Sequence, residues 1–224
     1  MKFRNFSLAI LLLTTTAMVS QNISIDSLHR PRNYHIQVNQ FESYPNSKED
    51  IIFLGNSITA GTSWSELLGL PNAKNRGISG DTTFGILERL DEVIEGEPAK
   101  VFILIGINDI ARNYPDEIIV SNYEKIIDRI KNGSPETEVF IQSILPVNNT
   151  FTRYKNHYNK DEHILAINKE LEKLAQTYNV NFIDLHPHFL DEEDRLSKKF
   201  TEEGLHLNAT AYKTWAKILQ DYLN

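Results

Sequence analysis

Ser57 has the residue type and the surroundings that nucleophilic catalysis requires. It follows an apolar run at residues 51–54 and lies in the stretch Gly55-Asn56-Ser57-Ile58-Thr59, before a helical segment. Its hydroxyl should therefore lie at the rim of a sheet, near a helix N-terminus. A lone serine at such a place is also typical of an ordinary helix cap or turn. The nucleophile reading therefore depends on whether the other necessary groups are present.

A serine nucleophile needs a base within hydrogen-bond reach, a group that orients the base, and donors aimed at the developing oxyanion. His206 is the candidate base, and Glu203 lies three residues before it, so one turn can place a carboxylate behind the imidazole. Gly80 offers a backbone N–H with no side chain in the way, and Asn108 offers a carboxamide. Each role thus has one candidate.

Other chemistries find less support in the 224 residues. The chain has no cysteine, which excludes disulfides, zinc-thiolate sites, iron–sulfur clusters and cysteine nucleophiles. The Gly-rich turn after residues 51–54 matches neither GxGxxG nor GxxxxGK[ST], so a nucleotide fold is disfavoured. A polar cluster with metal-ligand residue types lacks a regular spacing and is interpreted as a solvated surface turn; it comprises His186, His188, Asp191, Glu192 and Asp194.

The elements that must position these residues alternate along the chain. Short apolar runs, typical of parallel strands buried on both faces, occupy residues 51–54, 101–105, 139–144 and 180–185, with a weaker one at 73–78. Helical patterns follow from Thr82 or Thr83 to Ile94, from Pro115 to Gly133, from Ile164 to Tyr178, and over residues 209–223. This order predicts an α/β three-layer sandwich with a five-stranded, mostly parallel sheet. Ligands bind at the carboxyl ends of such strands, where Ser57, Gly80 and Asn108 should meet.

The first 50 residues are interpreted as two consecutive segments with different roles. Residues 1–20 begin with Lys2 and Arg4 and continue into an apolar run that ends too early for a membrane span, which is the secretory signal pattern. We expect cleavage near Ser20/Gln21, export to the periplasm or exterior, and no stable membrane anchor. Residues 21–50 are interpreted as an N-terminal arm with a short helix between Pro31 and Pro45, and residues 51–224 as the catalytic domain. Cleavage changes the net charge from −7 to −9, and this acidic balance argues against nucleic acid as a partner.

Four blocks in this order resemble the SGNH hydrolases, also called the GDSL lipase/esterase family. They are Gly55-Asn56-Ser57-Ile58, Gly80, Gly106-x-Asn108-Asp109 and Glu203-Gly204-Leu205-His206. Residues 77–82 and 204–208 are most similar to platelet-activating-factor acetylhydrolase-like proteins and bacterial carbohydrate O-acetylesterases. The resemblance implies a flavodoxin-like sheet, no metal and no cofactor. It also implies Ser57 as nucleophile, His206 as base, and an oxyanion hole formed by the Ser57 and Gly80 N–H groups and the Asn108 side chain.

One departure from the family pattern concerns the third triad member. Glu203 stands where the family usually has Asp, so its carboxylate must fold back to reach the imidazole. Glu202 or a backbone carbonyl are the alternatives for orienting His206.

The flanking loops offer substrate-binding candidates. Arg112, Asn113 and Tyr114 either line a substrate pocket or form a polar loop before Pro115. Aromatic rings in or near the loops at this end of the sheet either stack on sugar rings or cover the core edge; they are Trp64, Phe84, Phe151, Tyr154, His157 and Tyr158.

The residues and the resemblance together predict a secreted serine esterase for small acyl groups, chiefly acetyl esters on carbohydrate. A lysophospholipase or acyl-thioesterase is the alternative enzyme, and a glycan-binding relative without activity is the alternative outside enzymes. The expected partner is a small ester or an acetylated carbohydrate, and the sequence does not define the oligomeric state.

Overall fold

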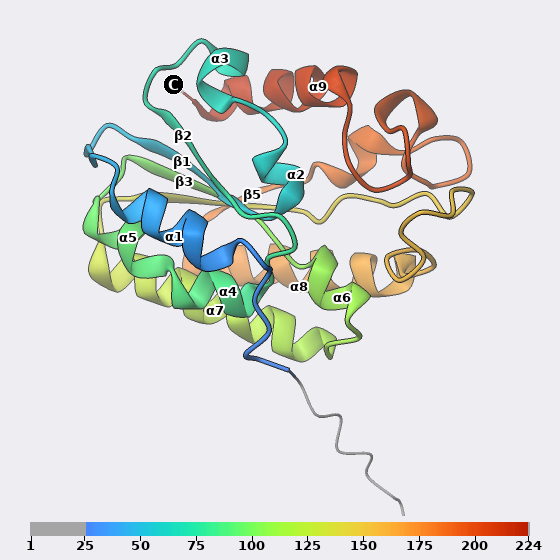
Figure 1. The fold of residues 1–224 in the computed structure, drawn as a ribbon, viewed down its shortest axis with the longest axis horizontal. Coiled ribbons are helices and arrows are strands. Elements are labelled where there is room, and N and C mark those ends of the chain that lie inside the picture. Colours follow the sequence, from blue (N-terminus) through green and yellow to red (C-terminus); the bar gives the residue numbers. More distant parts are fainter. Residues whose placement is uncertain (1–25, 224) are drawn as a thin grey trace, which may run out of the picture.

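The computed structural model describes residues 26–223 and contains one five-stranded sheet (Figure 1). Its strands are β1 (Ile51–Gly55), β2 (Ala73–Gly77), β3 (Lys100–Leu104), β4 (Glu138–Gln142) and β5 (Asn181–Ile183). They lie in the order β2-β1-β3-β4-β5, and every neighbouring pair is parallel. This is the flavodoxin-like order, so the predicted α/β sandwich is confirmed. The direction of winding reverses between β1 and β3, and their carboxyl ends therefore border the expected ligand crevice.

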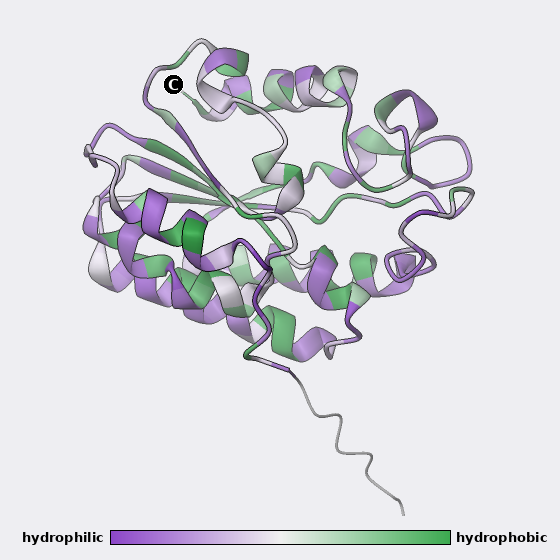
Figure 2. Ribbon diagram, in the orientation of Figure 1, coloured by the Kyte–Doolittle hydropathy of each residue, from purple (hydrophilic) through white to green (hydrophobic). Residues whose placement is uncertain are grey.

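Helices cover both faces of the sheet (Figure 1). α3 (Trp64–Leu68) and α9 (Ala209–Leu219) lie on one face; α4 (Thr83–Glu88), α5 (Leu90–Glu95), α7 (Asp116–Gly133) and α8 (Asp161–Tyr178) lie on the other. Two short helices, α2 (Ser57–Ala60) and α6 (Ile107–Ala111), begin directly after β1 and β3. Figure 2 shows the hydrophobic residues concentrated in the strands other than the edge strand β2, with hydrophilic residues on β2 and on the outer sides of the helices.

An aromatic row fixes the packing of α3 and α9 on the sheet. Phe53, Phe102 and Phe140 are register partners on β1, β3 and β4, and their rings stack with centroids 5.1 and 4.4 Å apart. Trp64 of α3 stacks on Phe53 at 3.9 Å, and Trp215 of α9 meets Trp64 edge-on at 4.8 Å. These rings are buried, and aromatic burial of this kind is a major source of core stability.

Two predicted helices differ from the observed ones. The pattern from Thr82 to Ile94 forms α4 and α5 instead of one helix, because Arg89 leaves helical geometry (φ −102°, ψ 12°). The Arg89 side chain turns into the core, where it binds Asp81 and the carbonyl of Gly55. The last helix ends at Leu219 and continues as a 3-10 turn, Gln220–Tyr222.

The segment before β1 packs along the sheet edge and the α4 side of the molecule (Figure 1). Its helix, α1 (Tyr34–Glu42), lies between Pro31 and Pro45, where the sequence predicted it. The Tyr34 hydroxyl donates to Gly85 O at 2.6 Å, and Arg30 donates to Glu88 at 2.7 Å. The arm is thus held by buried and exposed polar contacts to α4.

The predicted signal segment, residues 1–20, lies outside the described residues. Among residues 26–223, no helix has the length and apolar character to cross a membrane.

Candidate active site

Ser57 lies in the tight turn between β1 and α2. The Asn56 side chain caps α2 by accepting the Ile58 N–H at 2.9 Å. Gly55 closes the turn: a Cβ there would lie 2.2 Å from Thr59 Oγ1 and 2.3 Å from Leu104 O, so no side chain fits. This turn holds Ser57 half-buried at the carboxyl edge of the sheet, as the sequence predicted.

His206 lies beside Ser57, although 149 residues separate them in sequence. Ser57 Oγ is 2.9 Å from His206 Nε2. On the other side of the ring, His206 Nδ1 is 3.1 Å from Glu203 Oε1. A hydroxyl, an imidazole and a carboxylate are therefore hydrogen-bonded in series, which is the geometry of a nucleophile, its base and the group that orients the base.

Glu203 reaches His206 because the chain folds back on itself within one turn. Its Oε1 accepts the backbone N–H groups of Leu205, at 3.2 Å, and of His206. Gly204 permits the turn: its φ is +86°, and a Cβ would lie 2.5 Å from Asn148 O. The extra methylene of Glu relative to Asp is taken up by this fold-back.

Glu202 points elsewhere. It is exposed, and its carboxylate accepts from the Asn208 side chain at 3.4 Å. Within the described chain, the hydrogen-bond partner of His206 Nδ1 is the Glu203 carboxylate, and no backbone carbonyl takes this place. The geometry therefore favours Glu203 over both alternatives.

The three candidate oxyanion donors lie on neighbouring strand ends. The N–H groups of Ser57 and Gly80 donate to no acceptor within residues 26–223. Asn108, in the first turn of α6, uses one side-chain N–H to bind Asp81 O at 2.8 Å, which leaves its second N–H available. Gly80 has φ +81°, and Pro31 of the arm packs against the position where a Cβ would stand, at 3.4 Å.

Buried polar contacts fix the loop that carries Gly80. Asp81 accepts from Arg89 Nε at 3.0 Å, and Arg89 also donates to Gly55 O at 3.1 Å, so one arginine connects the Gly80 loop to the end of β1. Burial raises the pKa of Asp81, and the Arg89 charge opposes this shift. No sequence pattern indicates this pair, since Asp81 is singled out in the sequence only by its position after residues 73–78.

A second buried carboxylate joins the Asn108 helix to α4. Asp109 accepts the Thr83 N–H at 3.0 Å and the Thr83 hydroxyl at 2.6 Å, and Asn122 donates to the same hydroxyl at 2.9 Å. Burial raises the pKa of Asp109 to about 7. The residue that follows Asn108 therefore anchors α6 to the start of α4.

One segment after β4, residues 154–158, contacts three of the site residues. The Tyr154 ring meets the His206 ring edge-on at 5.1 Å. His157 Nε2 lies 3.1 Å from Asn108 Oδ1, and the Tyr158 hydroxyl donates to Glu203 O at 2.5 Å. The sequence singled out these rings only as sugar-stacking or core-covering groups, and no local pattern indicates their contacts with residues some 45 to 52 positions away.

The other aromatic candidates divide between core and rim. Trp64 is 1% exposed and donates its indole N–H to Thr59 O at 3.0 Å, so of the two alternatives, sugar stacking and covering the core, its burial excludes sugar stacking. Tyr158 is also buried. Phe84 packs edge-on against Tyr114 at 5.8 Å, and Phe151 lies under Gly204.

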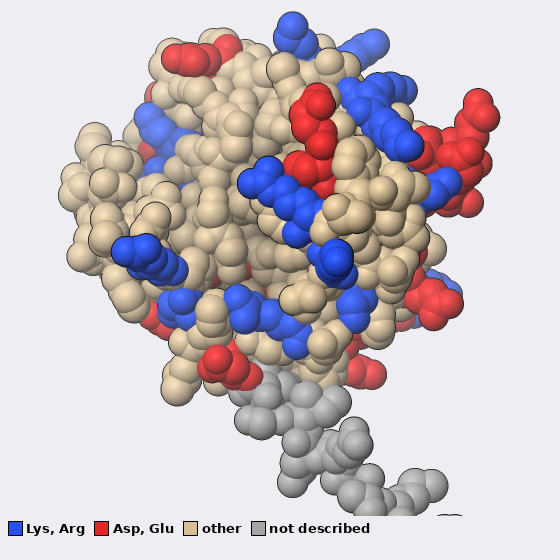
Figure 3. Space-filling view, turned by 45° about the vertical axis from the view of Figure 1, so that its right-hand side comes forward, with Lys and Arg blue, Asp and Glu red and all other residues tan. Residues whose placement is uncertain are grey.

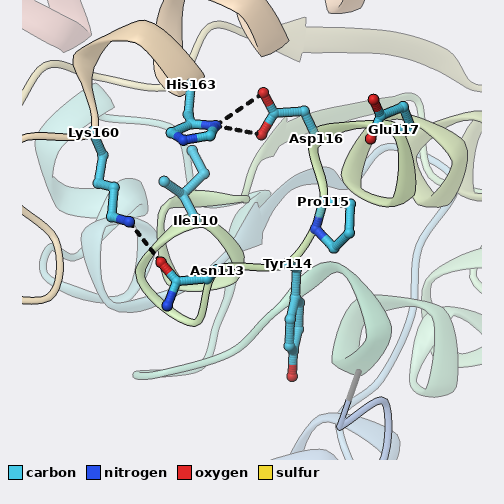
Figure 4. A pocket seen from close by; sticks show the side chains of 8 residues that line it. All are labelled: Ile110, Asn113, Tyr114, Pro115, Asp116, Glu117, Lys160 and His163. Atoms are coloured by element: carbon cyan, nitrogen blue, oxygen red, sulfur yellow. Dashed lines mark hydrogen bonds and ion pairs between the residues drawn. The ribbon is translucent and has the colours of Figure 1, made fainter. Parts of the chain in front are cut away.

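Asn113 and Tyr114 line a separate pocket of about 300 Å³ beyond α6 (Figure 4). Across it, Lys160 binds Asn113 at 2.6 Å and His163 binds Asp116 at 2.9 Å. Ser57 and His206 do not line this pocket. Arg112 instead contacts His29 of the arm at 2.5 Å.

The His- and carboxylate-rich segment after β5 is tied to backbone groups. His186 Nδ1 bonds Ile144 O at 2.9 Å, and Asp191 accepts the N–H groups of Glu193 and Arg195. In the described part of the chain, no three His or carboxylate side chains are grouped so as to hold a metal ion.

A flavodoxin-like sheet with a hydrogen-bonded Ser, His and Glu at its carboxyl edge has the architecture of an SGNH-type serine hydrolase. Residues 53–214 match the GDSL-like lipase/acylhydrolase family. The chain belongs to this family, as the sequence blocks predicted, and it is a carboxylic ester hydrolase.

Curated relatives agree with this assignment, and a solved structure shares the fold. Arylesterase from Vibrio mimicus is 30% identical over 177 residues, which cover 71% of this chain and 80% of the relative. Platelet-activating factor acetylhydrolase IB subunit alpha2 from Homo sapiens is 27% identical over 194 residues, with 84% and 82% covered. The structure of a GDSL-like lipase from Bacteroides thetaiotaomicron is 22% identical, covers 85% of this chain and 97% of that chain, and superposes with a TM-score of 0.75.

Proposed function

We propose that the protein is an exported serine esterase that hydrolyses small acyl esters, chiefly acetyl esters of carbohydrates, through an acyl-enzyme. The observation that carries the catalytic part is the unbroken series from Ser57 Oγ through the His206 ring to Glu203 Oε1, with separations of 2.9 and 3.1 Å. Export rests on the signal pattern of residues 1–20.

In the proposed mechanism, His206 Nε2 takes the Ser57 proton while Ser57 Oγ attacks the ester carbonyl carbon. The tetrahedral intermediate then collapses, and the same proton passes from His206 to the departing alcohol. Water next gives a proton to His206 and attacks the acyl-enzyme. Collapse of the second intermediate returns the proton to Ser57 and releases the acid. Glu203 holds Nδ1 protonated throughout and stabilises the imidazolium.

The oxyanion is assigned to three donors: the Ser57 and Gly80 N–H groups and the second N–H of Asn108. The first two donate to no protein acceptor among residues 26–223, which supports this role. Fixed donors of this kind act where charge develops and need no reorganisation during the reaction.

The preference for a short acyl group and a sugar alcohol has separate support. Relatives that match more than four-fifths of this chain are named acetylhydrolases. Residues 152–157 line an open hollow of about 390 Å³ that combines the Tyr154 ring with Arg153, Lys155 and Asn156. Neither Ser57 nor His206 lines it, but the Tyr154 ring meets the His206 ring at 5.1 Å. Figure 3 shows this side of the molecule with basic, acidic and neutral side chains interspersed. Hydroxyl groups of a sugar suit such a surface better than a long acyl chain does.

The purified protein without residues 1–20 tests the proposal with p-nitrophenyl acetate and p-nitrophenyl octanoate. We expect faster release from the acetate, and Ser57→Ala should abolish release from both. A preference for the octanoate would replace the short-acyl proposal with the lysophospholipase or thioesterase alternative. Undiminished activity of Ser57→Ala would refute the whole mechanism.

The alcohol is identified with acetylated xylan, acetylated sialic acid and lysophospholipid as competing substrates. Acetate release from one of the two carbohydrates is the expected result. Turnover of the lysophospholipid alone would exclude carbohydrate, and binding to glycan without turnover of any ester would indicate a non-catalytic relative.

A further inference from the structure

The Asn108 carboxamide has a defined orientation because both of its ends are hydrogen-bonded. Its Nδ2 donates to the Asp81 carbonyl oxygen at 2.8 Å, and its Oδ1 lies 3.1 Å from His157 Nε2. A backbone carbonyl can only accept a hydrogen bond, so the amino end of Asn108 must face Asp81. The oxygen end must then face His157.

This orientation also determines which nitrogen of His157 carries a proton. Asn108 Oδ1 is an acceptor, so His157 Nε2 must be the donor in this contact. Burial lowers the pKa of His157, and the neighbouring His206 lowers it further, which favours the neutral ring. A neutral imidazole has one N–H, and here it is committed to Asn108.

The other ring nitrogen has no such contact. His157 Nδ1 is buried and has no hydrogen-bond partner within the described residues. The contact with Asn108 Oδ1 is therefore the one hydrogen bond that the ring makes among these residues.

We propose that His157 is a positioning residue that holds the Asn108 carboxamide with its free N–H directed at the oxyanion. The proposal rests on the proposed esterase function and on the assignment of Asn108 to the oxyanion hole. Without His157 the carboxamide keeps its bond to Asp81 but can rotate about it. A bond to Oδ1 also draws electron density toward the oxygen, which makes the remaining N–H a stronger donor.

The segment that carries His157 makes this role part of a larger contact. Tyr154 packs on the His206 ring, and the Tyr158 hydroxyl binds the Glu203 carbonyl. Residues 154–158 therefore bridge the base, His206, and the oxyanion donor, Asn108, which lie 98 positions apart in the sequence. This segment therefore links the position of the His206 ring to that of the Asn108 carboxamide.

The test compares three replacements of His157 with the enzyme assayed on p-nitrophenyl acetate. His157→Gln places an amide N–H near the Nε2 position, whereas His157→Asn is one methylene shorter and His157→Leu has no donor. We expect kcat to fall about 10- to 100-fold in the Leu and Asn variants, because the loss of a whole oxyanion donor costs about 10²–10³-fold. The Gln variant should retain kcat within about threefold, and KM should change little in all three, since the contact matters mainly in the transition state. His163→Leu, which removes an exposed histidine paired with Asp116, is the control and should keep full activity.

A double-mutant cycle with Asn108→Ala separates positioning from a structural role. In the Asn108→Ala background, His157→Leu should cause no further loss of kcat, because the group it positions is gone. An undiminished loss in that background, or equal kcat for the Gln and Leu variants, would overturn the proposal. If His157→Leu does not fold, His157→Asn takes its place, both in the comparison of kcat with His157→Gln and in the double-mutant cycle.

Ser57→Ala is assayed alongside these variants. If Ser57→Ala stays active, the esterase mechanism has failed, whereas an inactive Ser57→Ala with unaffected His157 variants refutes the positioning role alone.

Discussion

The two halves of the candidate site are held in different ways. Ser57, Gly80 and Asn108 follow β1, β2 and β3 and are tied together by buried polar groups, among them Arg89, which is 4% exposed. His206 and Glu203 lie in a turn outside the sheet, where the His206 side chain is 33% exposed. We refer to these as the strand-end half and the turn half.

Because of this difference, we expect substitutions in the strand-end half to change stability and substitutions in the turn half to change activity. In the strand-end half, Asp81, Arg89 and Asp109 are buried charged or polar groups whose partners cannot be replaced by water, so a lost partner costs stability. In the turn half, the groups are partly solvated and the contacts are local. Substitutions there should reduce activity and leave the fold intact.

The largest effect is expected in the turn half. His206→Ala removes the base and should lower kcat by about 10⁴-fold or more, with little change in the free energy of unfolding. Steady-state hydrolysis of p-nitrophenyl acetate and urea denaturation measure the two quantities. An inactive variant that is also strongly destabilised would contradict the proposed division.

Glu203→Ala should have the next largest effect on rate, about 10³-fold in kcat, because His206 then lacks its orienting carboxylate. Glu202→Ala is the matched control, since Glu202 is exposed and binds Asn208 instead of His206. It should leave kcat unchanged. Equal, mild losses in the two variants would remove Glu203 from the triad.

Arg89→Met tests the strand-end half. It leaves the Asp81 carboxylate buried without its cation and should lower the free energy of unfolding by about 3–5 kcal/mol. Arg129→Met is the control: Arg129 pairs with the exposed Asp91, and its loss should cost at most about 1 kcal/mol. Similar urea midpoints for the two variants would show that the buried pair does not support the strand ends.

The last prediction concerns the pH dependence that Asp109 gives to stability. Its pKa is raised by burial to about 7, so between pH 4 and pH 7 the folded chain keeps a proton that the unfolded chain releases. Asp109 therefore makes the protein less stable as the pH rises through this window, by at most about 1.4 kcal/mol per pH unit, and adds no further change above it.

Urea denaturation of the native protein and Asp109→Asn at pH 5, 6, 7 and 8 measures this effect. The stability of the native protein relative to the variant should fall between pH 5 and pH 7. The exposed Asp91→Asn should show no such trend relative to the native protein. A constant difference between the native protein and Asp109→Asn would mean that Asp109 is ionised throughout.

Much of the strand-end half could be predicted from the sequence, because it is encoded locally. Each apolar run ends at a polar block, and a parallel sheet brings the ends of neighbouring strands together, so Ser57, Gly80 and Asn108 were expected to meet. The helix after β2 was only partly predictable. Its apolar periodicity continues through Arg89, and only the buried partner Asp81 explains why the helix breaks there.

Contacts between distant loops were not predictable in the same way. His157 lies 49 residues from Asn108, and no spacing in the sequence indicates that they touch. The sequence predicts Trp64 in or near a loop at the end of the sheet that carries the site, but its ring stacks on Phe53 in the core. The fold-back of Glu203 depends on the left-handed conformation of Gly204, which the sequence permits and does not specify.

The central claim, that Ser57 is the nucleophile activated by His206, is tested most directly by covalent labelling with a serine-reactive fluorophosphonate. The account predicts one adduct per chain, located on the peptide that contains Ser57, with labelling slowed strongly in His206→Ala. An adduct on another residue, or equal labelling rates with and without His206, would contradict it.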